Sequence, residues 1–304
     1  MQAIAFYIFF PFIWLVSRLP PRIAYVLSDV VFVILFYIIR YRKDVIINNL
    51  KTAFPDKKQH QIYALYKKST QHFCDSFIEV ILSMGLSEQE MRKRFVYTNV
   101  ALAKDLYEKR KPVVILFGHQ SSYEWTMCFD GQSDYKVIAV YKPLANKYFN
   151  DLIVKIRKKF NSTLIPSRLA TKEIGRSIES GELALYGLVA DQAPARYRAT
   201  HFTTFFNKTS AVFTGGERLA RKHNTAVVFL AVEKVKRGFY EATFHTITEN
   251  AADTEEWEIT DQFFDLLEQQ IKKQPEYYLW SHKRWKVTPK NAKRDVVLSP
   301  RVQQ

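Results

Sequence analysis

His119 and Glu124 are the residues whose types and spacing first suggest chemistry in this sequence. His119 follows Gly118, which ends the apolar run Val113–Phe117. Four residues separate the two side chains, so a bend over a strand-to-helix corner can bring a ring nitrogen and a carboxylate oxygen to hydrogen-bond distance. A carboxylate in that place fixes the tautomer of the imidazole and stabilises its protonated form. The spacing therefore suggests a general base with an orienting partner.

A structural role is the plainer alternative for both residues. A His beside a Gly in a loop is commonly a hydrogen-bonded structural residue, and a Glu in a first helical turn is favoured by the helix dipole without any chemistry. Ser121 and Ser122 are good N-caps for such a helix, and the absence of a GxSxG elbow disfavours a serine nucleophile. A metal pair is also disfavoured, because the pattern of two His at i and i+4 is absent.

The elements that position these residues follow from the hydrophobic pattern. Val113–Phe117 is a short continuous apolar run, which is typical of a strand buried on both faces. Strands then alternate with helices of about ten residues, which indicates βαβ units and a largely parallel sheet. Arg237 and Gly238 turn a hairpin, so we predict an α/β fold with a mixed, mostly parallel sheet flanked by helices. A long helix is predicted from a cap at Asp56 to about residue 85; the other predicted helices are 101–109, 147–160, 171–180, 214–223 and 260–273, and the other predicted strands are 94–98, 137–141, 163–166, 183–189, 226–234 and 239–245.

Polar residues follow three of the predicted strands at their carboxyl ends. His119 follows the buried strand, Arg168 follows the strand that ends at residue 166, and Asp191 with Gln192 follows the strand that ends at residue 189. The ligand crevice of an open α/β sheet lies beyond the carboxyl ends of its strands, so these side chains are expected on one rim. Each alone has a plain explanation as a solvated loop residue or a helix cap. Together they favour a site.

Two apolar stretches open the chain. Residues 1–16 are apolar except for Gln2, and a second stretch covers residues 23–39 after a break rich in Arg and Pro. Each is slightly shorter than the roughly 20 residues that cross a bilayer. No basic residue precedes the first stretch and no small-residue cleavage site follows it, so we predict a retained membrane anchor with the following arginines on the cytoplasmic side. The alternative is that both stretches are ordinary core helices.

The charge balance points to negatively charged partners. The 304 residues carry a net charge of +15, and 47% are hydrophobic, which supports a sizeable core. Nucleic acid, an anionic membrane, a phosphorylated substrate or an acidic protein would each suit this charge. Cys74 and Cys128 form no CxxC, which disfavours a disulfide framework or structural zinc. Basic residues interleaved with Trp280 and Trp285 suit nucleic acid or a membrane interface, and the N-terminal anchor favours the membrane.

Four groups of residues, taken in order, resemble the late, lauroyl- and myristoyl-type, Kdo-dependent acyltransferases of lipid A biosynthesis. The resemblance covers nearly the whole chain and implies kinship in fold with glycerolipid acyltransferases. The segment between His119 and Glu124 departs from that of many members, which bears on the acceptor and the acyl chain length. The groups are residues 49–55, Gly118-His119 with Glu124, Gly181-Glu182 leading to Asp191-Gln192, and Tyr278-Leu279-Trp280 with His282, Arg284 and Lys286.

The resemblance implies an inner-membrane enzyme, on the cytoplasmic face, that moves a fatty acyl chain from acyl carrier protein to a hydroxyl of a lipid A precursor. It implies catalytic roles for His119 and Glu124. Arg168, Asp191, Gln192 and Gly118 are then candidates for binding substrate or stabilising the oxyanion. We expect no metal and no cofactor, the acyl carrier protein being a co-substrate, and no nucleic acid as a partner.

The chain divides into three predicted parts, and two other functions stay open. Residues 1–43 would anchor the protein, residues 44–289 would form the acyltransferase domain, and residues 290–304 would be a polar, frayed tail. An acyltransferase for another lipid, such as a lysophospholipid or an amino-acid-based lipid, would share the His119 site and the anchor. A non-enzymatic, basic membrane-associated protein would need His119 only for stability.

Overall fold

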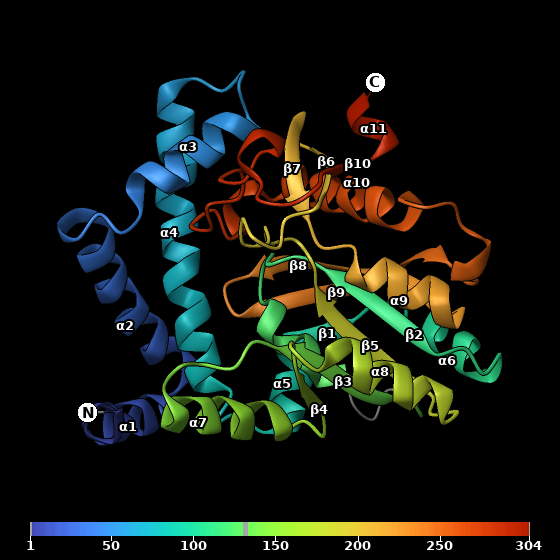
Figure 1. Ribbon diagram of the computed structural model, residues 1–304. Coiled ribbons are helices and arrows are strands. Elements are labelled where there is room, and N and C mark those ends of the chain that lie inside the picture. Colours follow the sequence, from blue (N-terminus) through green and yellow to red (C-terminus); the bar gives the residue numbers. More distant parts are fainter. Residues whose placement is uncertain (1, 130–132, 304) are drawn as a thin grey trace.

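The computed structural model describes residues 2–129 and 133–303. In this part of the chain the strands form a larger sheet in the order β1-β9-β8-β2-β5-β3-β4 and a smaller one in the order β10-β6-β7 (Figure 1). In the larger sheet β8 and β9 pair antiparallel, and the other neighbours pair parallel. The structure confirms an α/β fold with a mixed sheet flanked by helices. The strands are β1 (Phe95–Tyr97), β2 (Val113–Phe117), β3 (Lys136–Tyr141), β4 (Thr163–Pro166), β5 (Ala184–Val189), β6 (His201–Phe205), β7 (Lys208–Val212), β8 (Ala226–Lys236), β9 (Phe239–Thr248) and β10 (Val297–Leu298).

The helices predicted downstream of the N-terminus are present with bounds that differ by a few residues, whereas the helices over residues 43–53, 88–94 and 300–303 were not predicted. The apolar residues of the predicted helices recur at helical spacing, and this periodicity located those helices in the sequence. The helices are α1 (Gln2–Ser17), α2 (Pro21–Val33), the π-helical η1 (Ile34–Ile38), α3 (Lys43–Ala53), α4 (Gln59–Leu82), α5 (Glu88–Arg94), α6 (Val100–Glu108), the 3-10 helix η2 (Tyr123–Phe129), α7 (Lys147–Lys158), α8 (Ala170–Glu179), α9 (Gly215–His223), the 3-10 helix η3 (Ala251–Asp253), α10 (Glu258–Lys273), the 3-10 helices η4 (Pro275–Tyr277) and η5 (Pro289–Asn291), and α11 (Pro300–Gln303).

Strand β2 is packed on both faces, as its apolar run predicts. All five of its residues are buried. Val114 and Leu116 lie in a core cluster that includes residues of α4, α8, α9 and α10, whereas Ile115 and Phe117 lie in a second cluster with residues of α5, α6 and η2. A strand with a packed layer on each side has no polar face, which explains why its sequence does not alternate. Polar residues of a functional site must therefore follow β2, since the strand itself contains none.

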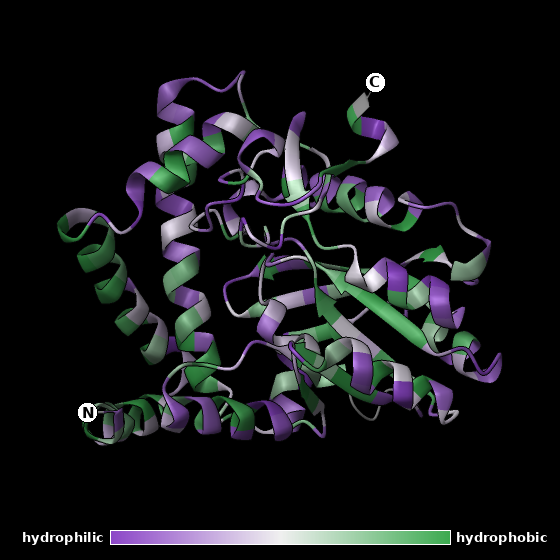
Figure 2. Ribbon diagram, viewed as in Figure 1, coloured by the Kyte–Doolittle hydropathy of each residue, from purple (hydrophilic) through white to green (hydrophobic). Residues whose placement is uncertain are grey.

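The N-terminal helices lie to one side of the sheet. Figure 1 shows α2 leaning along the long helix α4, with α1 beside α7, and Figure 2 shows α1 and α2 as largely hydrophobic. Among the described residues, the helix long and apolar enough to cross a membrane is Pro21–Ile38, whereas the apolar helix Gln2–Ser17 is shorter. The sequence had favoured the first stretch as the span. Outward-facing residues such as Val26 and Val30 are exposed on α2.

Two local predictions are wrong at the ends of elements. Asp56 does not cap α4, which begins at Gln59, and the backbone N–H of Lys58 donates to Gln61 Oε1 at 2.8 Å in its place. The tail after residue 290 is not frayed as predicted over residues 297–303, because β10 pairs parallel with β6 and α11 follows it. Its few apolar residues gave no periodic signal, and the pairing depends on a β6–β7 hairpin that the sequence analysis did not predict.

Asn49 joins α3 to the C-terminal segment that borders the site. Its side-chain Nδ2 donates to the carbonyl oxygens of Trp280 and His282, each at 2.7 Å. The side chain is buried, so both carbonyls lose their partner if the amide is removed. This contact connects two of the four residue groups that carry the family resemblance.

We expect Asn49→Ala to lower the free energy of unfolding by roughly 1–3 kcal/mol, the usual cost of leaving buried polar groups without partners. Asn48 is the exposed neighbour on the same helix, so Asn48→Ala is the matched control and should stay within about 0.5 kcal/mol of the parent. Urea unfolding of the detergent-solubilised proteins measures both. Equal stability of the two variants would contradict the role given to Asn49.

Candidate active site

The turn after β2 is held against the segment that follows η4. The N–H of Leu279 donates to the carbonyl of His119 at 3.0 Å, and the N–H of Ser121 donates to the carbonyl of Tyr277 at 2.8 Å. Between them, Gln120 forms an antiparallel bridge with Tyr278. Backbone hydrogen bonds thus fix the path of the chain on both sides of the imidazole.

The carboxylate that contacts His119 is Asp191. Its Oδ1 lies 2.6 Å from His119 Nδ1, and its Oδ2 accepts the backbone N–H of the same residue at 3.2 Å. Tyr278 also donates its hydroxyl to Asp191. The two residues meet because β2 and β5 are parallel neighbours, with Phe117 opposite Val189. His119 and Asp191 lie at the same edge of the sheet, as predicted. Their direct hydrogen bond was not predicted from the sequence.

Glu124 does not pair with His119, so the expected His–Glu contact is wrong. Its carboxylate accepts two hydrogen bonds from Arg157 Nη2, at 2.8 and 2.9 Å, and one from Nε at 3.1 Å. The turn between the two residues passes into a 3-10 helix, not an α-helix, and this places Glu124 opposite α7. Arg157 was missed because it lies inside a predicted helix, where nothing marked it among the other basic residues.

The electrostatics of the pair favour an imidazole whose protonated form is stabilised by the Asp191 carboxylate. Burial disfavours protonation of His119, but the Asp191 and Glu124 carboxylates together outweigh burial and raise the pKa of His119 above its ordinary value. Burial likewise opposes ionisation of Asp191, yet His119 and Tyr278 hold its pKa below the usual range. With Nδ1 donating to Asp191, His119 Nε2 carries the lone pair and accepts from the Gln192 amide at 3.1 Å.

The two serines after His119 do not cap a helix as predicted. Ser122 Oγ donates to Glu79 Oε2 on α4 at 3.1 Å. Ser121 has a φ of +53°, in the left-handed region that residues with a side chain seldom adopt, and its carbonyl faces His72 Nε2 at 3.3 Å. Both serines are therefore contacts between the turn and α4.

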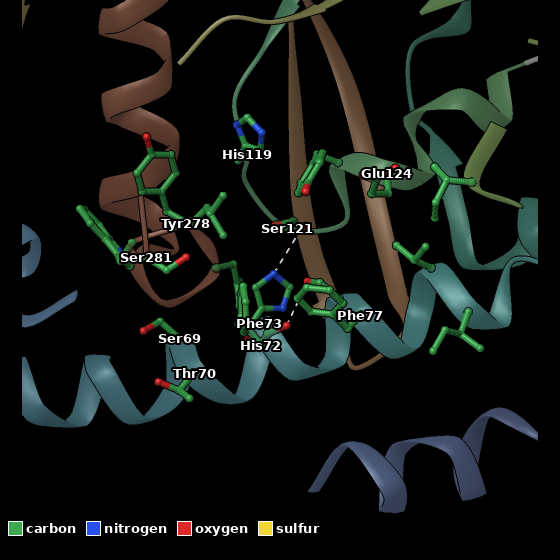
Figure 3. Close-up of a pocket in the computed structure, with 18 of the residues that line it drawn as sticks. Ser69, Thr70, His72, Phe73, Phe77, His119, Ser121, Glu124, Tyr278 and Ser281 are labelled. Atoms are coloured by element: carbon green, nitrogen blue, oxygen red, sulfur yellow. Dashed lines mark hydrogen bonds between the residues drawn. The ribbon is translucent and has the colours of Figure 1, made fainter. Parts of the chain in front are cut away.

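A cavity of about 610 Å³ opens beside this turn. In Figure 3, His119, Ser121 and Glu124 lie across from His72, Phe73 and Phe77 of α4. Apolar residues of α1, α4 and α7 also line it, so its walls can contact a hydrocarbon chain as well as the polar groups of the turn. These apolar residues are Ile13, Val80, Ile81, Phe149 and Ile153.

The remaining predicted site residues have different positions. Arg168 is exposed and is not among the described residues that line the cavity. Gly118 packs against Leu267 so closely that a Cβ would lie 2.5 Å from its Cδ1, which explains the glycine by packing. Gln192, unlike Arg168 and Gly118, contacts His119 through its side chain. His282 accepts the N–H of Ala193 at 3.2 Å, and burial lowers its pKa to about 4.

Comparisons with known proteins point in one direction. A family model described as bacterial lipid A biosynthesis acyltransferase matches residues 1–287. The lipid A biosynthesis palmitoleoyltransferase of Escherichia coli K12 is 21% identical over 279 residues, covering 91% of this chain and 89% of the relative. The lipid A biosynthesis lauroyltransferase of the same organism is 20% identical, covering 91% of this chain and 90% of the relative. A lipid A biosynthesis acyltransferase of Shigella flexneri is 21% identical with the same coverage as the first.

Asp191→Asn should lower the pKa of His119, because burial then acts without the carboxylate that opposes it. Glu124→Gln is the comparison variant, and its effect should be smaller because Glu124 makes the smallest of the stated contributions to the pKa of His119. Imidazole resonances of His119, followed by NMR as the pH is changed, report both values. A His119 pKa that falls more in Glu124→Gln than in Asp191→Asn would assign the dominant interaction to the wrong carboxylate.

Proposed function

Because the chain belongs to the bacterial lipid A biosynthesis acyltransferase family, we propose that it transfers a fatty acyl chain from acyl carrier protein to a hydroxyl of a lipid A precursor. The single observation that supports this most directly is the pair His119–Asp191, with Nδ1 held at 2.6 Å from the carboxylate and the histidine lining a cavity whose walls are both polar and apolar. A positioned base next to space for a hydrocarbon chain suits acyl transfer between a carrier and a lipid.

His119 acts as the general base in this proposal. A hydroxyl is too weakly acidic to attack a thioester at neutral pH, so Nε2 takes its proton as the oxygen bonds to the carbonyl carbon. The tetrahedral intermediate then collapses with cleavage of the C–S bond, and the imidazolium returns the proton to the leaving thiolate. The products are an ester and the free thiol of the carrier, so atoms and charge balance.

Asp191 orients the base, and the neighbouring groups support it. Its carboxylate fixes Nδ1 as the donor and stabilises the imidazolium that forms during the reaction. Glu124, held by Arg157, adds negative potential from a longer distance. The Gln192 amide is released from Nε2 when the acceptor hydroxyl replaces it, and it can then donate to the oxyanion. Arg168 has no part in this arrangement.

The N-terminal helices hold the enzyme at the inner membrane in this proposal, with the site on the cytoplasmic face. Pro21–Ile38 is apolar and exposes Val26 and Val30 to the surroundings, and Ile13 of α1 lines the cavity. An acceptor held in the bilayer would then reach the cavity from the side of these helices. The net charge of +15 suits the acidic carrier, the phosphates of a lipid A precursor and the anionic membrane surface.

His119→Ala should lower the turnover number by roughly 10² to 10⁴, the usual contribution of a positioned general base. His60 is exposed at the start of α4, so His60→Ala is the matched control and should retain parent turnover. The assay uses acylated carrier and lipid A precursor at saturation, with mass spectrometry of the product. Turnover of folded His119→Ala within a few-fold of the parent would remove the base, and acylation of a lysophospholipid or an amino-acid-based lipid only would replace the acceptor.

Val26→Gln with Val30→Gln should weaken membrane attachment, because these side chains are 61% and 51% exposed on α2 and would otherwise contact lipid. Val235 is 59% exposed on β8, which makes Val235→Gln a control of equal exposure outside the N-terminal helices. The fraction retained in the membrane pellet after an alkaline carbonate wash should fall several-fold for the double variant only. An intact chain that is soluble without detergent would overturn the anchor.

A further inference from the structure

A carboxylate buried in the last turn of α4 connects three separate parts of the protein. Glu79 is 1% exposed, and its Oε1 accepts the hydroxyls of Tyr25 at 2.9 Å and Tyr240 at 2.7 Å. Its Oε2 accepts the hydroxyl of Ser122 at 3.1 Å. These donors come from α2, from β9 and from the turn after His119. A buried carboxylate costs free energy unless it is hydrogen-bonded, so the three hydrogen bonds stabilise Glu79 in this position.

The turn that Glu79 holds is under backbone strain. Ser121 has a φ of +53°, and a non-glycine residue in this region persists only where the surroundings hold it in place. Helix α4 supplies two of the contacts that do so, namely His72 to the Ser121 carbonyl and Glu79 to the Ser122 hydroxyl. The turn that carries His119 therefore depends on where α4 places these two side chains, as well as on its backbone hydrogen bonds to Tyr277 and Leu279.

The contact with α2 has further support around it. Ser28 Oγ donates to Asp75 Oδ1 at 2.7 Å, and Arg237 bridges Asp75 and Asp29, with Nη2 at 2.6 Å from each. Gly238 lets Tyr25 approach, since a Cβ there would lie 2.4 Å from the Tyr25 hydroxyl oxygen. Helix α2 thus turns its polar groups inward toward α4, whereas its outward face is apolar.

We propose that Glu79 is a positioning residue that ties the turn carrying His119 to the seating of α2 against α4, so that acyl transfer at full rate requires α2 to be in place. The inference rests on the proposed role of His119. Tyr25 binds Glu79 only when α2 is packed against α4, and Glu79 in turn binds Ser122 in the turn after His119. A shift of α2 would therefore move Glu79 and, through it, the turn. Neither Tyr25 nor Glu79 lines the cavity, so both act through the turn and not on the substrate.

A double-mutant cycle on Tyr25→Phe and Ser122→Ala tests the relay, since each variant removes one hydroxyl and leaves the fold intact. Each single variant should lower kcat on the order of ten-fold, because small misplacements of a catalytic group are costly. KM for carrier and acceptor should change little. The double variant should be no slower than the slower single variant, because groups that act as one unit are strongly non-additive.

Tyr135→Phe is the matched control, because Tyr135 is a buried tyrosine whose hydroxyl donates to the carbonyl of Lys111, away from the cavity. It should keep parent kcat. Parent kcat in Tyr25→Phe, or effects on kcat that multiply in the double variant, would overturn the relay. His119→Ala in the same assay separates the two proposals: if it is inactive while Tyr25→Phe and Ser122→Ala are not slowed, only the relay fails, and if it is active, the proposed function fails.

Glu79→Gln and Glu79→Leu give a second comparison. Gln keeps the shape and can still accept from the tyrosines through Oε1, while its NH₂ group can donate to the Ser122 hydroxyl, so both links survive in weaker form. Leu removes both. We expect Glu79→Gln to retain clearly more kcat than Glu79→Leu among folded proteins, and equal kcat in the two would contradict a positioning role.

Discussion

A buried negative charge at the end of a buried strand governs how the site is built. Asp191 is 1% exposed, and a carboxylate there is tolerated only when hydrogen bonds and a nearby positive charge replace its lost hydration. His119 supplies a ring N–H and a backbone N–H, and Tyr278 supplies a hydroxyl. These donors come from the end of β2 and from the C-terminal segment, so the charge holds both against the end of β5. Because Nδ1 of His119 is bound to Asp191, the ring nitrogen that a ligand can contact is Nε2, in place of the Gln192 amide.

Helix α4 has to satisfy two environments at once. Toward the cavity it presents Phe73 and Phe77, while its buried acids Asp75 and Glu79 bind polar groups of α2 and of the β8–β9 turn. Helix α2 has the complementary arrangement, with hydroxyls and a carboxylate inward and valines outward. This pattern on α2, with polar groups inward and apolar groups outward, is typical of a helix in contact with lipid, because polar groups on a membrane helix face the protein interior.

The sequence located most elements because hydrophobic periodicity is a local signal. Strand β2 was predicted with the bounds that the structure gives it, and the rule that ligands lie beyond strand ends brought His119 and Asp191 to one rim. The choice of partner for His119 was wrong because it depended on spacing along the chain, whereas the contact comes from two parallel strands. Arg157 and Glu79 lie within helices, where only the tertiary packing distinguishes them from solvated or core positions.

The pairing order of the sheet sets a sequence of events during synthesis. Strand β2 lies between β5 and β8, whose first residues are Ala184 and Ala226, so the strand that leads to His119 leaves the ribosome well before either neighbour exists. The apolar N-terminal helices emerge earlier still, and under the proposed anchoring they enter the bilayer first. Until β8 is made, β2 has an open edge that invites association with other chains. Under that proposal the nascent protein is tethered before its sheet is complete, which keeps the unfinished sheet close to the membrane on which the finished one would work.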